Sequence, residues 1–96
     1  MVSDPNVLIL ASLAEGDKHG YAIILDVERF AGVRLGAGTL YGAITRLEEL
    51  GWIRALEGEE RRKPYRITAA GKRALDEQTA GLDRVVKTAR RRLRIV

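Results

Sequence analysis

The sequence predicts a mainly α-helical protein with a small β-hairpin and a long C-terminal helix. Three observations lead to this fold class. Apolar residues recur at helical spacing in three consecutive segments that end before residue 52. Residues 52–67 then alternate on both sides of a polar turn, which is typical of a hairpin. The remaining segment returns to helical spacing. With 96 residues, the chain is large enough for one modest core and not for a second.

The first two helices are predicted from their ends and from their apolar spacing. Residues 3–5 combine a helix cap with a proline at the first helical position, and the apolar segment 6–14 follows. We expect this helix to be buried on most sides. The second helix is predicted over residues 20–31, and Gly32 ends it. Its apolar positions are Tyr21, Ile24, Leu25, Val27 and Phe30.

The third helix and the hairpin follow. This helix is predicted to end at Gly51, and its apolar positions are Leu40, Ile44, Leu47 and Leu50. Residues 52–56 and 65–67 are predicted strands joined by a polar turn. Pro64 has no N–H to donate, so we expect an exposed sheet edge there. Thr68 is expected to cap the last helix.

Three helices, a two-stranded hairpin and a long helix are the elements of a winged helix-turn-helix, in that order. We therefore expect a winged helix-turn-helix over residues 1–70, with the hairpin as its wing. Residues 71–96 are expected to form a C-terminal dimerisation helix within the same compact unit.

Composition narrows the function. The formal charge of +4 at pH 7 favours anionic partners. The chain has no cysteine and a single histidine, so we expect no disulfide, no metal site and no cofactor. It has no catalytic triad, paired acids or phosphate-binding loop, so an enzyme is not expected. The apolar run 7–14 is too short to span a bilayer, and the first residues lack the basic start of a signal peptide. These features indicate a cytoplasmic protein without membrane contact.

The exposed side of the third helix is expected to contact double-stranded DNA. Small residues let a helix enter the major groove, hydroxyls bond phosphates or base edges, and arginine pairs bidentately with guanine. The side opposite the apolar stripe contains Thr39, Gly42, Thr45 and Arg46. The alternative is an ordinary amphipathic surface helix.

The wing adds a second set of candidate DNA contacts. Arg61, Arg62 and Lys63 at the tip can follow a phosphate backbone or enter a minor groove. The hydroxyl of Tyr65 can reach a phosphate while its ring packs on the strand. The alternative is a solvated turn whose charge prevents aggregation of an edge strand.

Several spaced motifs occur between about residue 7 and residue 75. They are His19–Gly20–Tyr21, Gly38–Thr39–Leu40–Tyr41, Arg46–Leu47–Glu48, Gly51, Arg62–Lys63–Pro64–Tyr65, and Thr68 with Gly71. Together they resemble the PadR family of bacterial transcriptional regulators. The resemblance implies a short family member with one C-terminal helix. It also implies a homodimer that binds pseudo-palindromic DNA, usually as a repressor, and is often released by a small-molecule effector.

The resemblance also assigns roles by position. It places Thr39, Tyr41, Arg46, Lys63 and Tyr65 at positions that face DNA bases or phosphates. Tyr21 corresponds to a tyrosine that supports the helix-turn-helix near the DNA backbone. The complete set of expected DNA contacts is Tyr21, Gly38, Thr39, Tyr41, Gly42, Thr45, Arg46, Arg61, Arg62, Lys63 and Tyr65.

Two positions depart from the family pattern. The family commonly has proline directly after the recognition-helix tyrosine, where this chain has Gly42. It often has glutamate after the His-Gly-Tyr motif, where this chain has Ala22. Glycine leaves the first turns of the third helix less ordered in advance.

The last helix carries a heptad-like stripe that predicts dimerisation. The stripe consists of Leu75, Leu82, Val86, Ala89 and Leu93. The alternative is that its first half covers the first helix of the same chain and the rest frays. Residues 84–96 contain six basic residues and no acid. The helix dipole is the commoner explanation for this charge, and a direct DNA contact is the alternative.

Two hypotheses stand beside that of a DNA-binding regulator. The first is a protein-interaction or assembly module that keeps the winged helix, and retention on a DNA column would separate it from a regulator. The second, weaker hypothesis is an RNA-binding winged helix, which duplex RNA would reveal by competition. An effector would need a pocket at the dimer interface or against the winged helix.

Overall fold

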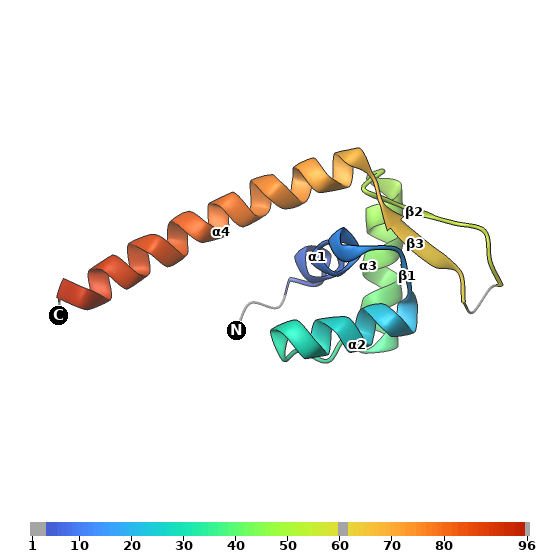
Figure 1. The fold of residues 1–96 in the computed structure, drawn as a ribbon, viewed down its shortest axis with the longest axis horizontal. Coiled ribbons are helices and arrows are strands. Elements are labelled where there is room, and N and C mark those ends of the chain that lie inside the picture. Colours follow the sequence, from blue (N-terminus) through green and yellow to red (C-terminus); the bar gives the residue numbers. More distant parts are fainter. Residues whose placement is uncertain (1–3, 60–61, 96) are drawn as a thin grey trace.

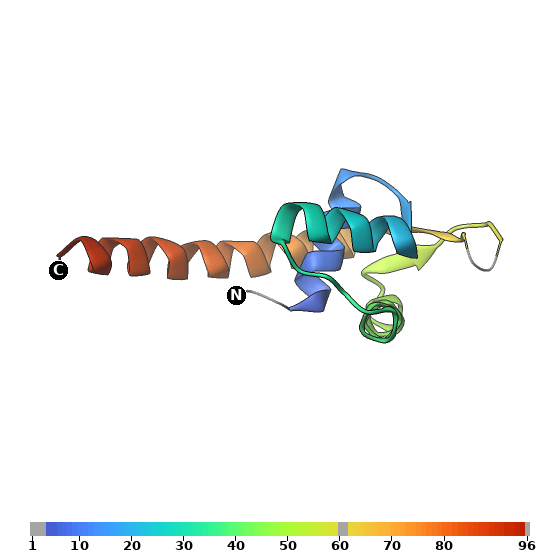
Figure 2. The same cartoon turned by 90° about the horizontal axis from the view of Figure 1, so that it is seen from below.

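The computed structural model describes residues 4–59 and 62–95, which form four helices and a three-stranded sheet (Figure 1). Helices α1, α2 and α3 and the sheet make up a body, and α4 extends far beyond it (Figure 2). The predicted fold class is confirmed. In chain order, the elements are α1 (Pro5–Glu15), β1 (Lys18–His19), α2 (Gly20–Ala31), α3 (Ala37–Glu49), β2 (Ile53–Ala55), β3 (Pro64–Ile67) and α4 (Ala69–Ile95).

The helix ends are set by local hydrogen bonds, as the sequence predicts. The Asp4 carboxylate accepts from the Asn6 N–H at 3.0 Å and caps α1, with Pro5 at the first position. Helix α2 has the predicted bounds. Gly51 has a φ of 74°, the left-handed conformation that ends α3. The Thr68 hydroxyl accepts from the Gly71 N–H at 3.0 Å and caps α4, as expected.

The sheet differs from the expected two-stranded hairpin. Its order is β1-β3-β2, with both neighbours of β3 antiparallel to it. The expectation of an exposed edge at Pro64 is wrong, because β3 is the middle strand and Pro64 pairs with His19. The strand tolerates this proline because Pro64 is its first residue. The Pro64 carbonyl still accepts from the Leu56 N–H at 2.8 Å.

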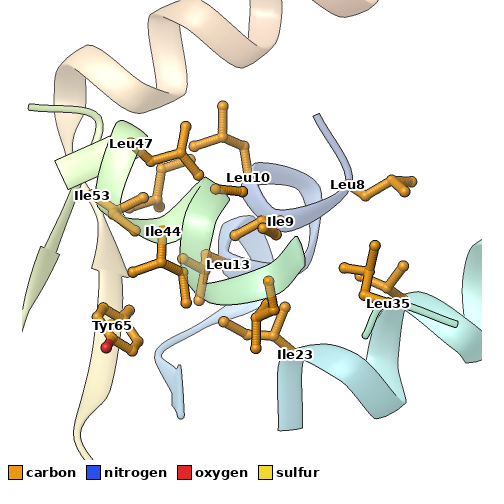
Figure 3. Packing of buried hydrophobic residues seen from close by; sticks show 14 residues of the cluster. Leu8, Ile9, Leu10, Leu13, Ile23, Leu35, Ile44, Leu47, Ile53 and Tyr65 are labelled. Atoms are coloured by element: carbon orange, nitrogen blue, oxygen red, sulfur yellow. The ribbon is translucent and has the colours of Figure 1, made fainter. Parts of the chain in front are cut away.

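One core holds these elements together (Figure 3). Helix α1 contacts α2, α3, α4 and β3, so it is buried on most sides, as expected. On β3, Tyr65 and Ile67 point into the core while Arg66 points out. The fully buried large side chains are Ile9, Leu10, Leu13, Ile23, Val27, Leu40, Ile44, Leu47 and Ile53.

Helix α4 begins against the link between α3 and β2. The Thr68 N–H donates to the Trp52 carbonyl at 2.9 Å, and the Thr68 hydroxyl donates to the Gly51 carbonyl at 2.6 Å. A Cβ at Gly71 would overlap the Trp52 carbonyl oxygen, so only glycine permits this approach. The first turns of α4 are therefore fixed to the body. None of the helices in the described part of the chain is long and apolar enough to span a membrane.

Candidate nucleic-acid interface

Helix α3 presents the predicted side chains to solvent. Leu40, Ala43, Ile44 and Leu47 are buried, and the positions between them are exposed. The exposed residues include Gly38, Thr39, Tyr41, Gly42, Thr45 and Arg46. The N-cap of α3 is Gly36, which provides no side-chain hydrogen bond. The first N–H groups of α3 are therefore available to an acceptor, and the positive end of the helix dipole favours an anion there.

Thr45 and Arg46 have more specific geometry than the sequence indicates. The Thr45 hydroxyl donates to the Tyr41 carbonyl at 3.0 Å, so in this conformation its oxygen is free only to accept. Arg46 lies in the last turn of α3. Its guanidinium folds back toward Gly42, since Nη1 would lie 3.8 Å from a Cβ at that position. Arg46 has no acidic partner among residues 4–59 and 62–95.

The exposed glycines of α3 are not required by the protein's own packing. A Cβ at Gly38 would have nothing within 4 Å, and one at Gly42 would make only ordinary contact with Arg46. Neither glycine has a positive φ. Gly42, in the interior of α3, lowers helix stability by about 0.5–1 kcal/mol relative to alanine. Their smallness therefore serves no purpose inside the described fold.

Tyr41 joins α3 to the start of α2. Its side chain is 45% exposed, and its phenol lies against Gly20, where a Cβ would overlap the hydroxyl oxygen. The next residue, Tyr21, is 60% exposed. His19 pairs with Pro64 in the sheet. The start of α2, the first half of α3 and the root of the wing therefore meet at one place.

The predicted wing residues that the structure describes differ in their exposure. Arg62 is exposed and Lys63 is half-buried, and the Arg62 N–H donates to the Glu59 carbonyl at 2.9 Å. Arg61 lies outside the described residues. Tyr65 is only 7% exposed and belongs to the core, so its ring supports the wing from inside (Figure 3). The burial agrees with the expected packing of the ring, and the contact of the Tyr65 hydroxyl with a phosphate stays a prediction.

An ion pair ties the wing to the segment before α2. Arg66 of β3 donates to both carboxylate oxygens of Asp17, at 3.0 and 2.7 Å. The hydrogen bond from Arg66 lowers the pKa of Asp17, and the same bond raises the pKa of Arg66. This bidentate contact adds to the β1–β3 pairing and holds the sheet against the helix-turn-helix.

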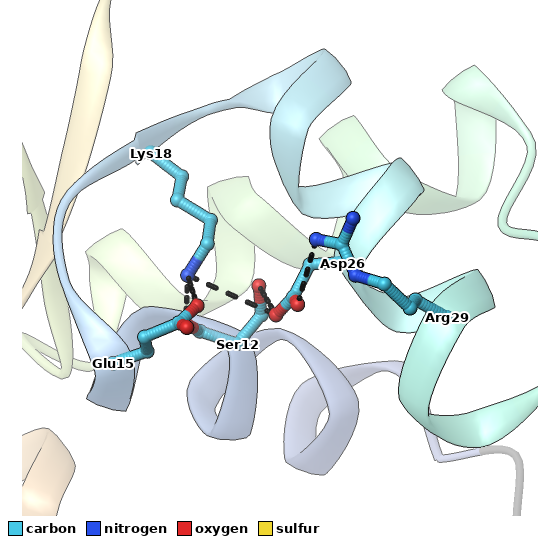
Figure 4. A network of polar contacts seen from close by, with 5 residues as sticks. All are labelled: Ser12, Glu15, Lys18, Asp26 and Arg29. Atoms are coloured by element: carbon cyan, nitrogen blue, oxygen red, sulfur yellow. Dashed lines mark hydrogen bonds and ion pairs between the residues drawn. The ribbon is translucent and has the colours of Figure 1, made fainter.

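A second polar network joins α1, β1 and α2 (Figure 4). The buried Ser12 hydroxyl donates to Asp26 at 2.8 Å, and Lys18 contacts Asp26, Glu15 and the Ser12 carbonyl. Burial opposes ionisation of Asp26. Hydrogen bonds from Ser12 and Arg29 and the charge of Lys18 outweigh this effect, so the pKa of Asp26 is lowered. The network fixes α2 relative to α1.

The predicted dimerisation stripe separates into two parts. Leu75 is partly buried against the core of its own chain. Leu82, Val86 and Leu93 are 39%, 46% and 73% exposed, and Ala89 is also exposed. The alternative hypothesis is therefore correct for the first half of α4, which covers α1. It is wrong about fraying, since the helix continues to Ile95.

An exposed α3 beside a hairpin, on a three-helix body, defines a winged-helix DNA-binding fold. The sequence profile of the "Transcriptional regulator PadR-like family" matches residues 9–77. The chain belongs to this family. Its members are transcriptional regulators rather than enzymes, which confirms both the resemblance and the expectation of no enzymatic activity.

Individual relatives agree with this assignment. The transcriptional regulator Rv3488 of Mycobacterium tuberculosis is 35% identical over 83 residues, which cover 82% of this chain and 76% of that protein. An uncharacterized 37.1 kDa protein in transposon TN4556 of Streptomyces fradiae is 41% identical over 83 residues. The match covers 86% of this chain but 24% of that protein, so the chain spans about a quarter of its length. A PadR family transcription regulator from Clostridium difficile has a TM-score of 0.81 at 29% identity, over 93% of this chain and 97% of its own.

Proposed function

We propose that this regulator binds a pseudo-palindromic operator as a homodimer and represses transcription in the cytoplasm. In this proposal, α3 enters the major groove, the wing contacts the flanking backbone, and Tyr21 and Tyr41 lie near phosphates. Thr39, Thr45 and Arg46 are the candidate readers of base edges. Arg61, Arg62 and Lys63 are the candidate wing contacts.

The proposal rests on the presence of glycine at position 42. Gly42 lies in the interior of α3, at a position where alanine would fit and would stabilise the helix. A close approach of another surface explains such a glycine, because an added methyl group would hold that surface away. A Cβ at Gly38, one turn earlier, would also fit, because nothing lies within 4 Å of it. An ordinary amphipathic surface helix has no reason to contain both.

The exposed half of the α4 stripe supports the dimer. Leu82, Val86 and Leu93 would remain partly in water in a monomer, and their spacing places them on one side of the helix. Two copies joined through these residues present two α3 helices. A small-molecule effector would act by changing the distance between those two helices.

Selection of bound sequences from random duplexes tests the proposal. We expect an inverted repeat with half-site centres about 34 Å apart, one turn of DNA. Enrichment of single half-sites would contradict the dimeric mode. Absence of any enriched sequence, with retention of the protein on an immobilised protein partner, would favour an assembly module.

A further inference from the structure

The net positive charge of the chain lies entirely at the end of α4. The first 83 residues contain 11 basic and 13 acidic side chains, so their net charge is −2. The last 13 residues contain six basic side chains and no acidic one, so their net charge is +6. The strongest attraction for an anionic partner therefore comes from the end of α4, which lies far from α3 and the wing (Figure 1).

Four of these basic residues form one face of α4, which we call the basic face. Its members are Lys87, Arg90, Arg91 and Arg94, which line a shallow hollow and are all exposed. At about 100° per residue, Lys87, Arg91 and Arg94 point to the side opposite Gly71, Leu75 and Gln78, which face the body, and Arg90 lies at the edge of that side. Helices α1 and α2 lie on the body side of α4 (Figure 1). The basic face therefore points away from the surface that holds Tyr21 and the start of α3.

The helix dipole does not explain this face. Its effect is confined to the last turn of a helix, and in α4 the basic residues of that turn are Arg92 and Arg94. Lys87, Arg90 and Arg91 lie earlier. Like charges three and four residues apart repel each other on a helix, so the arrangement is locally unfavourable.

Internal ion pairs do not explain the face either. Lys87 pairs with Asp83 at 2.8 Å. The three arginines have no acidic partner in residues 4–59 and 62–95. Three unpaired guanidinium groups therefore remain available on one side of an isolated helix.

The chemistry of the face indicates a phosphate backbone. Three of its four residues are arginine, whose planar fork matches phosphate oxygens. The face extends over about 10 Å of helix, a length over which duplex DNA presents several charges. An anionic membrane is less suitable, because an amphipathic helix inserts its apolar side into a membrane, and the proposed dimer buries that side of α4. The exposed apolar residues of α4 lie on the opposite, body-facing side.

We propose that the basic face binds the phosphate backbone of a second DNA segment, without sequence preference. A regulator bound to its operator through α3 and the wing would then bind another duplex on the side of the molecule away from the operator. Operator binding rests on the proposed function, whereas capture of the second duplex depends only on α4.

A two-duplex capture experiment tests this inference. The protein is saturated with a short immobilised duplex that contains the selected operator, and a second, unrelated fluorescent duplex is added at increasing salt. We expect the wild type to retain the second duplex at low salt. Arg90→Gln/Arg91→Gln should weaken capture at least tenfold and lower the log–log salt slope by about two. Its operator affinity and dimer mass should stay within twofold of wild type.

Lys72→Gln/Arg73→Gln is the matched control, because it removes two exposed basic residues on the same side of α4, about five turns before Arg90 and Arg91. It should capture the second duplex as the wild type does. Equal loss in both variants, or no capture by the wild type, would overturn the inference. Loss of operator affinity or of the dimer in Arg90→Gln/Arg91→Gln would reassign the face to the operator complex or to a subunit contact. Retention of anionic vesicles without retention of DNA would assign it to a membrane.

If the wild type captures unrelated DNA through the basic face but selects no operator, the proposed function fails and this inference stands. For that case, direct binding of the unrelated duplex replaces the immobilised operator in the same comparison of variants.

Discussion

The glycines of this chain fall into groups with different physical causes. Gly32 and Gly51 have positive φ angles of 68° and 74°, which other residues rarely adopt. A Cβ at Gly71 would overlap the backbone carbonyl of Trp52, and a Cβ at Gly20 would displace the Tyr41 hydroxyl. Gly42 has neither constraint. Substitution by alanine should therefore have opposite effects on stability at Gly42 and at Gly71.

Gly42→Ala should stabilise the protein and weaken DNA binding. The free energy of unfolding should rise by about 0.5–1 kcal/mol, because alanine is the better helix former. Operator affinity should fall, because the methyl group lies on the face that approaches the groove. Urea unfolding and a fluorescence binding titration measure the two effects. Unchanged operator affinity in the stabilised variant would remove the close approach at Gly42 from the mechanism.

Gly71→Ala is the opposite case. It should destabilise the protein, because its Cβ would overlap the Trp52 carbonyl oxygen at the start of α4. Any loss of DNA binding in this variant should follow the fraction of unfolded protein.

Arg46→Ala should reduce specificity at one base position in each half-site. The guanidinium lies over Gly42 rather than at the end of the helix, on the side of α3 that is proposed to enter the major groove. Loss of a bidentate contact to guanine should cost about 1–3 kcal/mol on the best site. Binding to a set of single-base operator variants measures this effect. An equal loss on all sequences would instead assign Arg46 to a phosphate.

At the scale of single elements, the wing is more firmly connected than a hairpin. Strand β1 adds a third strand beside β3, and the Asp17–Arg66 pair links β3 to the residue that precedes β1. Since β1 runs directly into α2, the wing and the helix-turn-helix are expected to move as one unit. The described tip also contains Glu57 and Glu59 beside Arg62 and Lys63, so its charge is mixed.

Arg62→Ala should weaken DNA binding mainly through salt dependence. Each lost phosphate contact should lower the log–log salt slope by about one, with little change in sequence preference. Arg54→Ala provides a control, since Arg54 is an exposed arginine on strand β2, away from the tip. The slope is measured from titrations at several salt concentrations. Arg54→Ala should keep the wild-type slope. If Arg62→Ala keeps it as well, the wing is a solvated turn.

The network around Asp26 should make stability depend on acid pH. The pKa of Asp26 lies below its ordinary value of 3.8 in the folded state, so the folded protein favours the carboxylate. Its contribution is complete above about pH 5 and is lost as the pH falls through the folded-state pKa. Asp26→Asn should therefore be less stable than wild type at pH 7. It should lose less further stability between pH 5 and pH 3.

Urea unfolding at these three pH values checks the prediction. Some acid dependence should remain in Asp26→Asn, because Asp17 also has a lowered pKa. Parallel loss of stability in the variant and the wild type would show that Asp26 does not contribute to the acid dependence.

Most elements could be predicted from the sequence because their signals are local. From helical spacing and the final glycine, the bounds of α2 were predicted as the structure has them. Gly51 and Thr68 correctly predicted where α3 and β3 end. Strand β1 was missed, because two residues have no measurable period and its formation depends on pairing with a strand 46 residues later. The prediction that Pro64 lies at an exposed sheet edge was wrong for the same reason.

The candidate site was predicted in part. The exposed positions of α3 follow from helical phase, so sequence was sufficient there. The burial of Tyr65 and the contact between Tyr41 and Gly20 depend on how separate elements pack. Neither leaves a periodic signal along the chain.

At the scale of the whole molecule, α4 is fixed to the body at its start and has two different exposed sides beyond it. Its first turns are fixed to the body through Thr68, Gly71 and Leu75. Beyond Leu82 it extends into solvent with an apolar stripe on one side and the basic face on the other. A dimer that buries the stripe leaves the basic face accessible. The proposed subunit contact and the proposed anion binding are therefore compatible with each other.

Val86→Arg should separate dimerisation from folding. Val86 is 46% exposed in the described chain, so the substitution should leave the fold intact and place an unpaired charge in the proposed subunit interface. We expect a monomer or a weakened dimer by light scattering, with an unchanged helical circular dichroism spectrum. Ala80→Arg, which adds the same charge on the opposite side of α4, should remain dimeric. In a dimer, binding of the second half-site is intramolecular, so Val86→Arg should lose affinity for the inverted repeat far more than for a single half-site. A Val86→Arg protein that stays dimeric with wild-type operator affinity would show that the stripe is not the subunit interface.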